Sequence, residues 1–191
     1  MIDEIVLRIA KSAILSKFDS SYSFDKEALE DDYPFLKESG ACFVTLKYNG
    51  SLRGCIGSII AHRTLLEDII SNAISATFKD PRFNPLSKEE LSGLNLEVSI
   101  LTPPEILEYE DYEDLLKKVS PFKDGLILNY GSYQGTFLPQ VWDELKTPEL
   151  FLEHLSYKAG ANPSVFAYHP TIYRYRVEAI EENFDEVLCL Q

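Results

Sequence analysis

The segment Arg53-Gly54-Cys55-Ile56-Gly57 places a thiol, an arginine and two glycines within five residues. Thiolate is the reactive form of cysteine, and a neighbouring guanidinium favours it over the neutral thiol. Glycine inside a strand marks a bulge, or a place where another backbone or a ligand comes close. We therefore regard Cys55 as a candidate nucleophile and Arg53, Gly54 and Gly57 as candidate substrate-binding residues. The alternative is a buried, inert cysteine in a glycine-rich bend.

A cysteine nucleophile usually needs a base, and the chain has three histidines. His62 belongs to the same predicted hairpin as the thiol. His154 lies between Phe151 and Leu155, so we expect its ring to turn partly inward. His154 is the candidate base, and the alternative is a semi-buried histidine satisfied by hydrogen bonds. The sequence itself shows no Cys–His pairing.

Two charged residues could join Cys55. Arg82 lies in Asp80-Pro81-Arg82-Phe83, directly after a predicted helix. Either Asp80 simply caps the helix or pairs with Arg82, or Arg82 approaches the hairpin and adds a second cation to the site. Glu97 lies on the polar face of an otherwise apolar strand, where a carboxylate needs water or a partner. We expect Arg53 or Arg82 to pair with it.

The run Gly135-Thr136-Phe137-Leu138-Pro139-Gln140 predicts a strand that ends in a proline-limited turn. Its polar members Thr136 and Gln140 are candidate substrate-binding residues at the rim of a cleft. The alternative is plain strand termination.

Composition excludes several classes of protein. Net charge is −13, which suits neither a nucleic-acid backbone nor an anionic membrane surface. The stretch from Ser51 to Arg82 nevertheless sums to +1, which indicates either chance or a local pocket for an anionic group. Three widely spaced cysteines and the absence of nucleotide-binding or zinc motifs predict no cofactor and no metal site. Asp3 and Glu4 replace the basic start of a signal peptide, so we expect a cytoplasmic protein.

Periodicity predicts an α+β fold with a largely antiparallel sheet flanked by helices. The length of 191 residues fits one domain, or one domain with two lobes whose boundary is uncertain, and we expect residues 1–191 to form a single domain. Apolar spacing and capping residues predict helices over residues 2–18, 26–31, 64–79, 111–119 and 147–160. The run Ser87-Lys88-Glu89-Glu90 reads as a capping box and predicts one further helical turn. Alternation predicts strands over residues 41–48, 51–60, 94–101, 126–130, 133–138 and 171–180.

The dipeptide Asn49-Gly50 predicts a two-residue hairpin loop, which fixes the register of its strands. In that register Arg53 and Cys55 share one face, because side chains alternate along a strand. Leu52 and Ile56 take the other face, with Phe43. The predicted cross-strand pairs are Tyr48 with Ser51, Leu46 with Arg53, Val44 with Cys55, and Cys42 with Gly57.

Six blocks in order resemble the AMMECR family, named for the Alport syndrome, midface hypoplasia and elliptocytosis chromosomal region. They are Leu52-Arg53-Gly54-Cys55-Ile56-Gly57, Asp80-Pro81-Arg82-Phe83, Leu96-Glu97-Val98-Ser99, Lys123-Asp124-Gly125, Gly135-Thr136-Phe137-Leu138-Pro139-Gln140 and Lys158-Ala159-Gly160. The resemblance covers roughly residues 43–177. It implies two unequal lobes with the Cys55 segment at the cleft between them. Ser58-Ile59 stands where the family motif has Thr-Phe, which leaves the rim of the pocket open.

The resemblance supplies no reaction. It implies a companion of Memo-type and radical-SAM proteins, the protein A component of AmmeMemoRadiSam-type systems. We expect an enzyme-like or substrate-binding component in which Cys55 acts as nucleophile or covalent carrier and Arg53 and Arg82 hold a small anionic ligand. The alternative is a non-enzymatic adaptor that binds a partner protein.

Overall fold

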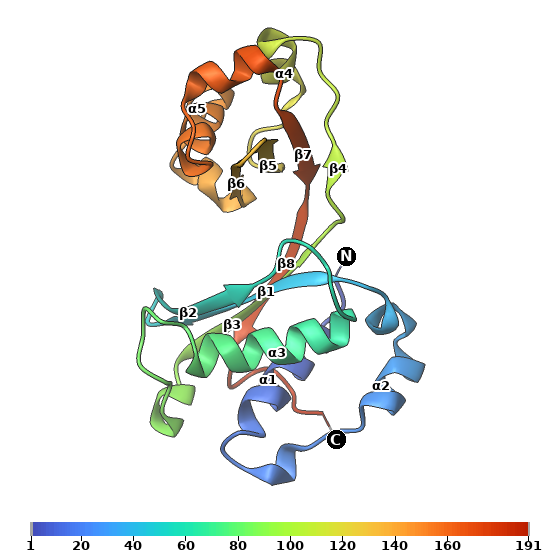
Figure 1. The fold of residues 1–191 in the computed structure, drawn as a ribbon. Helices are drawn as coiled ribbons and strands as arrows, with labels where there is room; N and C mark the ends of the chain where they lie inside the picture. The colour runs from blue at the N-terminus through green and yellow to red at the C-terminus, as the bar shows by residue number, and fades with distance from the viewer. Residues whose placement is uncertain (1, 191) are drawn as a thin grey trace. The chain divides into compact units, whose positions relative to one another are not determined.

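The computed structural model describes residues 2–190 and contains helices and two separate four-stranded sheets (Figure 1). The α+β class is therefore confirmed. The chain divides into two compact units, one formed by residues 2–101 with 178–190 and the other by residues 102–177. No helix in the described part of the chain is long and apolar enough to cross a membrane.

The first unit contains a sheet with strand order β2-β1-β3-β8. Its strands are β1 (Ala41–Tyr48), β2 (Ser51–Gly57), β3 (Leu94–Leu101) and β8 (Val177–Asn183). Its helices are α1 (Ile5–Leu15), α2 (Lys26–Asp32) and α3 (Leu65–Phe78), with short 3-10 turns η1 (Ser20–Tyr22), η2 (Pro34–Lys37) and η3 (Lys88–Leu91). Thr64 caps α3, and Ser87 with Glu90 forms the predicted capping box of η3.

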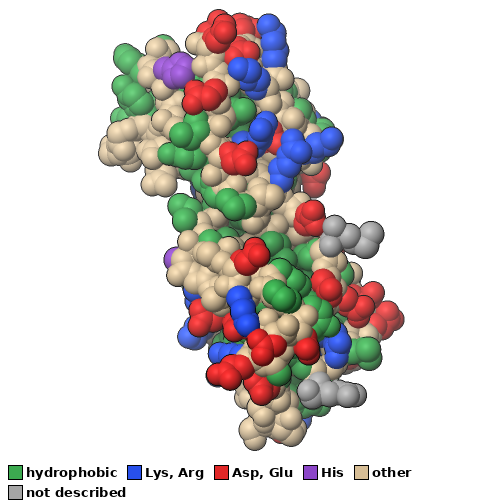
Figure 2. Space-filling view, turned by 90° about the vertical axis from the view of Figure 1, so that its right-hand side faces the viewer, with side chains coloured by type: hydrophobic (Ala, Val, Ile, Leu, Met, Phe, Trp, Pro, Cys, Tyr) green, Lys and Arg blue, Asp and Glu red, His purple; other side chains and the backbone are tan. Residues whose placement is uncertain are grey.

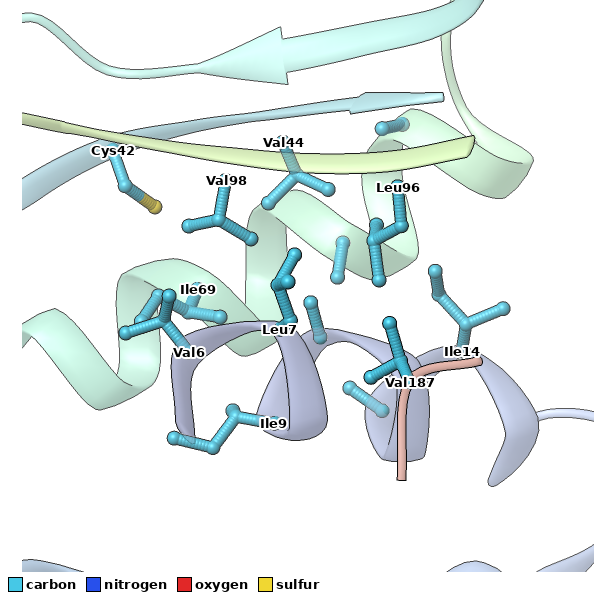
Figure 3. Close-up of a cluster of buried hydrophobic side chains, with 14 of the residues drawn as sticks. Val6, Leu7, Ile9, Ile14, Cys42, Val44, Ile69, Leu96, Val98 and Val187 are labelled. Atoms are coloured by element: carbon cyan, nitrogen blue, oxygen red, sulfur yellow. The ribbon is translucent and has the colours of Figure 1, made fainter. Parts of the chain in front are cut away.

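The core of the first unit lies between one face of this sheet and the helices α1 and α3 (Figures 1 and 3). Val44 and Leu96 point from the strands into the core, and Leu7 and Ile69 meet them from the helices. Cys42 is fully buried in the same layer. We call this the core face of the sheet and its reverse the second face.

The β1–β2 hairpin starts in the predicted register and then departs from it. Tyr48 pairs with Ser51 as expected, but a bulge then leaves Arg53 without a partner on β1. Beyond the bulge, Thr45 rather than Val44 lies opposite Cys55. The predicted faces were therefore partly wrong, since one extra residue reverses the alternation. Val44 now shares the core face with Ile56, whereas Phe43 lies opposite Gly57 on the second face.

The second unit contains a sheet with order β4-β7-β5-β6. Its strands are β4 (Glu105–Ile106), β5 (Gly125–Tyr130), β6 (Tyr133–Phe137) and β7 (Thr171–Tyr175). Its helices are α4 (Tyr112–Lys118) and α5 (Pro148–Lys158), with 3-10 turns η4 (Pro139–Asp143) and η5 (Pro163–Tyr168). In its core Trp142 stacks on Phe151 with ring centroids 3.8 Å apart.

The predicted strand over residues 171–180 is two strands, and each belongs to a different sheet. The break falls at Arg176. Its amide N–H donates to the Thr102 hydroxyl, and its carbonyl accepts from the Thr102 amide. Its guanidinium pairs with the fully buried Asp124 at 3.3 Å. Apolar and polar residues alternate without interruption from residue 173 to residue 179, so the sequence pattern alone did not reveal the change of sheet.

Glycine in β2 is required by the approach of a helix. A Cβ atom built on Gly54 would lie 2.1 Å from the carbonyl oxygen of Ala76 in α3. Gly57 is equally crowded, since its Cβ would meet the Phe43 ring at 2.3 Å. These contacts come from this chain's own backbone and side chains, so close packing explains both glycines.

We expect Gly54→Ala to lower the free energy of unfolding by about 3 kcal/mol or more, because the helix backbone cannot yield as a flexible side chain would. Urea denaturation measures the change. Gly131→Ala is the matched control, since Gly131 has a φ of 58° but nothing within 4 Å of its Cβ position. It should cost only about 1 kcal/mol. Equal losses for the two variants would contradict the close approach.

Candidate functional site

The backbone of Cys55 is held at the outer edge of the sheet by two side chains. Asp80, just after α3, accepts the Cys55 amide at 2.9 Å. Arg82 donates through Nη2 to the Cys55 carbonyl oxygen at 3.2 Å. Because β2 has no neighbouring strand on that side, this pair satisfies groups that would otherwise be left open at the edge.

Asp80 and Arg82 also bind each other. The side chain of Asp80 is 2% exposed, and its Oδ2 lies 2.7 Å from Arg82 Nη2. The Arg82 guanidinium holds the pKa of the Asp80 carboxyl well below its usual range, and the two amide donors add to this effect against the opposing effect of burial. Arg82 therefore pairs with Asp80, as one of the two sequence interpretations expected, and it also reaches the hairpin. Its role as a second cation of a binding site stays a prediction.

Arg53 points to a different group. Its Nε and Nη2 donate to the two carboxylate oxygens of Glu90 at 2.8 and 3.0 Å, and its Nη1 donates to the Asn84 carbonyl oxygen. The guanidinium lowers the pKa of Glu90 from 4.5 to about 2, helped by the Ser87 amide. The side chain of Arg53 is therefore already committed within the chain, and its role in holding an anion stays a prediction.

The Cys55 thiol lies on the second face of the first sheet. The Thr45 hydroxyl donates to its sulfur at 3.3 Å. Thr45 in turn lies opposite Glu97 on β3, so the row Cys55–Thr45–Glu97 crosses three strands. The Thr45 hydroxyl therefore holds the sulfur on this face of the sheet.

Glu97 does not pair with Arg53 or Arg82, and that prediction was wrong. Lys47 Nζ lies 3.0 Å from Glu97 and 2.9 Å from Glu181, bridging the two carboxylates. Ser99 also donates to Glu97, at 3.0 Å. Lys47 lies two residues from Thr45 on the same face of β1, so the correct register provides a nearer cation than either arginine.

The other two cysteines differ from Cys55. Cys42 is fully buried, and burial raises the pKa of its thiol well above the usual value. Its amide N–H donates to Asp68 and its carbonyl accepts from Asn72, so the residue fixes α3 to β1. Cys189 and Cys55 are both half-buried. Only Cys55 has a recorded hydroxyl donor on its sulfur among the described residues.

The first unit offers Cys55 no obvious imidazole base. His62 is exposed, and its Nδ1 lies 2.9 Å from the carbonyl oxygen of Ile60 in its own loop. His154 belongs to α5 in the second unit and is exposed, so its predicted inward turn was wrong. His169 stacks on Tyr109 and its Nε2 lies 2.9 Å from the Tyr109 carbonyl oxygen.

The remaining predicted residues also lie in the second unit. Thr136 donates to the Leu126 carbonyl oxygen at 3.0 Å, and its hydroxyl lies 3.3 Å from that of Tyr175. Gln140 is exposed in η4. Gly135 allows α5 to approach, since its Cβ would lie 2.6 Å from the Ala159 amide nitrogen. Their roles in binding, and the cleft itself, stay predictions.

Sequence reasoning missed Thr45, Lys47 and Glu90. The first two were hidden by the register, since the bulge at Arg53 decides which side chains face Cys55. Glu90 was recognised only as part of a capping box, although a capping glutamate has a second oxygen for another donor. Within residues 2–190, no group of three or more His, Cys, Asp or Glu side chains could hold a metal ion.

Comparison with known proteins shows the family of the chain. The model of the family described as AMMECR1 matches residues 7–180. The chain belongs to the AMMECR1 family. The AMMECR1-family chain is 40% identical over 171 residues to Protein MJ0810 of Methanocaldococcus jannaschii, covering 85% of this chain and 83% of the relative. It is 38% identical to a protein of Methanothermobacter thermautotrophicus, with 93% of each covered.

A solved structure agrees with the fold. The crystal structure of the uncharacterized protein PH0010 from Pyrococcus horikoshii matches with a TM-score of 0.79 at 35% identity. The match covers 94% of this AMMECR1-family chain and 90% of that one. The names of these three relatives state no activity, so membership of the family does not bring a reaction with it.

The Asp80 clamp generates a prediction about the edge strand. We expect Asp80→Ala to lower the free energy of unfolding by about 2–4 kcal/mol, because it leaves the Cys55 amide and the Arg82 guanidinium without their buried acceptor. Hydrogen exchange at the Cys55 amide should accelerate in the same variant. The control is Asp31→Ala, which removes an exposed ion pair with Lys37 and should cost under about 1 kcal/mol. Unchanged exchange at Cys55 would refute the clamp.

The Arg53–Glu90 pair predicts a dependence on pH. The folded-state pKa of Glu90 is depressed, so the pair's contribution to stability is present above 4.5 and is lost as pH falls toward 2. We expect Glu90→Gln to remove about 1–2 kcal/mol at neutral pH, a value reduced for partial solvent exposure. The variant should also lose less stability than the wild type over that acidic range. Urea denaturation at several pH values between 2 and 7 measures both losses of stability, with Glu89→Gln as the control. If the free energy of unfolding of wild type and Glu90→Gln changed with pH in the same way, the Arg53–Glu90 pair would not be the cause.

Proposed function

We propose that this AMMECR1-family protein is a substrate-binding, enzyme-like component whose functional group is the Cys55 thiol. The observation that carries the proposal is a half-buried sulfur, with a hydroxyl donor 3.3 Å away, on a strand whose backbone is fixed on both sides. A functional side chain needs such a fixed backbone to present it in one position. In this proposal Cys55 acts as nucleophile or covalent carrier.

The two arginines have different parts in the proposal. Arg53 donates its hydrogen bonds to Glu90 and to the Asn84 carbonyl oxygen, so in this proposal it positions β2. Arg82 positions Cys55 directly, and its side chain remains 54% exposed. Arg82 is therefore the better placed of the two to meet an anionic part of a substrate. Lys47 and Glu97 complete a polar row on the same face of the sheet as the thiol.

The source of a proton acceptor for Cys55 is the next part of the proposal. The described part of the first unit has one imidazole, that of His62, and it is turned to its own loop rather than paired with Cys55. A proton acceptor would come from the substrate or from a partner protein. We propose Memo-type and radical-SAM proteins as those partners, as the resemblance to the family implies, and the cytoplasm as the setting.

Site-resolved alkylation with iodoacetamide tests the role of Cys55. We expect Cys55 to react faster than an unfolded cysteine at neutral pH, and Cys42 to remain unmodified because it is buried. Thr45→Val should slow Cys55 alkylation several-fold by removing the donor to sulfur. Thr102→Val, in the second unit, is the control and should leave the rate unchanged. A Cys55 that reacts no faster than cysteine in urea would remove the nucleophile role.

One observation favours the alternative of a non-enzymatic adaptor. Gly54 and Gly57 are explained by packing against Ala76 and Phe43, so the glycine-rich segment does not itself require a ligand. An adaptor should tolerate Cys55→Ser in pull-downs of its partners, whereas a thiol enzyme should lose its activity with the same substitution. Arg82→Ala, which alters the surface beside Cys55, should weaken capture by an adaptor.

A further inference from the structure

A basic groove lies along α3 in the first unit, formed by residues that are not part of the Cys55 surroundings. Its volume is about 500 Å³. Four cationic side chains line it, against one carboxylate, that of Glu67. The four are Lys17, Lys26, Arg63 and Lys79. A surplus of three positive charges in one groove contrasts with the net charge of −13 for the chain, and Figure 2 shows acidic side chains spread over the face it draws.

The groove follows one face of α3. Glu67, Ser71 and Ser75 recur at four-residue spacing, and Ile70 and Ile74 lie beside them. The positions from Glu67 to Lys79 span about 18 Å at the helical rise per residue. The groove therefore presents an apolar strip with two hydroxyls. No hydrogen bond is recorded for the side chains of Ser71 and Ser75 within the described residues.

Three of the four cations have no side-chain partner in the described part of the chain. Among residues 2–190, Lys17, Lys26 and Lys79 form no recorded side-chain hydrogen bond or ion pair, although the chain has many more acids than bases. Arg63 is anchored instead, with Nε 2.7 Å from the buried Asp68. The three lysines outnumber the one carboxylate that lines the groove, that of Glu67. Like charges in surplus repel one another, and an anion relieves that repulsion.

We propose that this groove binds a small organic phosphate, with its phosphate groups at the lysines and its remaining body on Ile70 and Ile74. Lysine binds phosphate as a point charge, and serine hydroxyls add donors. Because Asp68 already neutralises Arg63, the three lysines leave a surplus of two positive charges over Glu67. A phosphate monoester carries close to two negative charges at neutral pH, so a phosphate or pyrophosphate ester matches that surplus. An acidic peptide would match the charge but not the size, since about 500 Å³ falls within the range of small-molecule sites.

Isothermal titration calorimetry of the full chain at low salt tests the proposal, with adenosine diphosphate, sodium pyrophosphate and inorganic phosphate as probes. We expect adenosine diphosphate or pyrophosphate to bind with a Kd of roughly 1 mM or tighter, and binding to weaken as salt rises. Lys26→Glu and Lys79→Glu should each weaken binding about tenfold, because reversal replaces an attraction by a repulsion. Lys146→Glu, an exposed lysine of the second unit, is the matched control and should bind as the wild type does.

A second measurement locates the ligand. Titration followed by ¹H–¹⁵N NMR should shift the amides of Ser71, Ser75 and Lys79 while leaving those around Cys55 unchanged. Phosphatidylcholine vesicles carrying phosphatidylinositol phosphate separate a lipid headgroup from a free metabolite: capture by these vesicles that Lys79→Glu abolishes would support the same site with a lipid source. Absence of binding by every probe, or binding that both reversals leave unchanged, would overturn the proposal. The outcome does not depend on whether Cys55 is reactive.

Discussion

The buried carboxylate of Asp80 is the group on which the geometry around Cys55 depends. It accepts the Cys55 amide N–H and pairs with Arg82, which in turn donates to the Cys55 carbonyl oxygen. An edge strand normally exposes these groups to water or to another chain. Here two side chains take the place of a neighbouring strand. The strand is held at the residue whose side chain is of chemical interest.

A second constraint is the close approach of a helix to a strand, and it appears in both units. Gly54 lets α3 bring the Ala76 carbonyl oxygen against β2, and Gly135 lets α5 bring Ala159 against β6. Each glycine belongs to a block that resembles the AMMECR family. Close packing therefore accounts for part of the pattern that first suggested a binding site. A family motif therefore contains residues required for packing together with residues that could take part in chemistry. Only the contacts in the structure distinguish the two kinds.

Helix α3 contacts both the strand that holds Cys55 and the basic groove. Its buried side meets the sheet through Asp68, which binds the Cys42 amide, and through Ala76 beside Gly54. The groove lies along a different face of the same helix, and Arg63 belongs to both, since it lines the groove and pairs with Asp68. The basic side chains of residues 51–82 therefore belong to two different places in the unit. Arg53 and Arg82 support β2, whereas Arg63 and Lys79 line the groove with Lys17 and Lys26.

The sequence by itself determined the fold class, the capped helices and the Asn49-Gly50 hairpin turn, because these follow from local periodicity and local turn chemistry. The pairing of Arg82 with Asp80 was one of two alternatives that the sequence left open, and it is a local contact between residues two positions apart. Only the tertiary structure decided which side chains meet Cys55. One bulged residue, Arg53, reversed the faces of the strand and brought Thr45 into contact with the sulfur. The partners of Arg53 and Glu97, the division of residues 171–180 between two sheets and the groove beside α3 all join positions distant in sequence, and periodicity carries no information about such pairs.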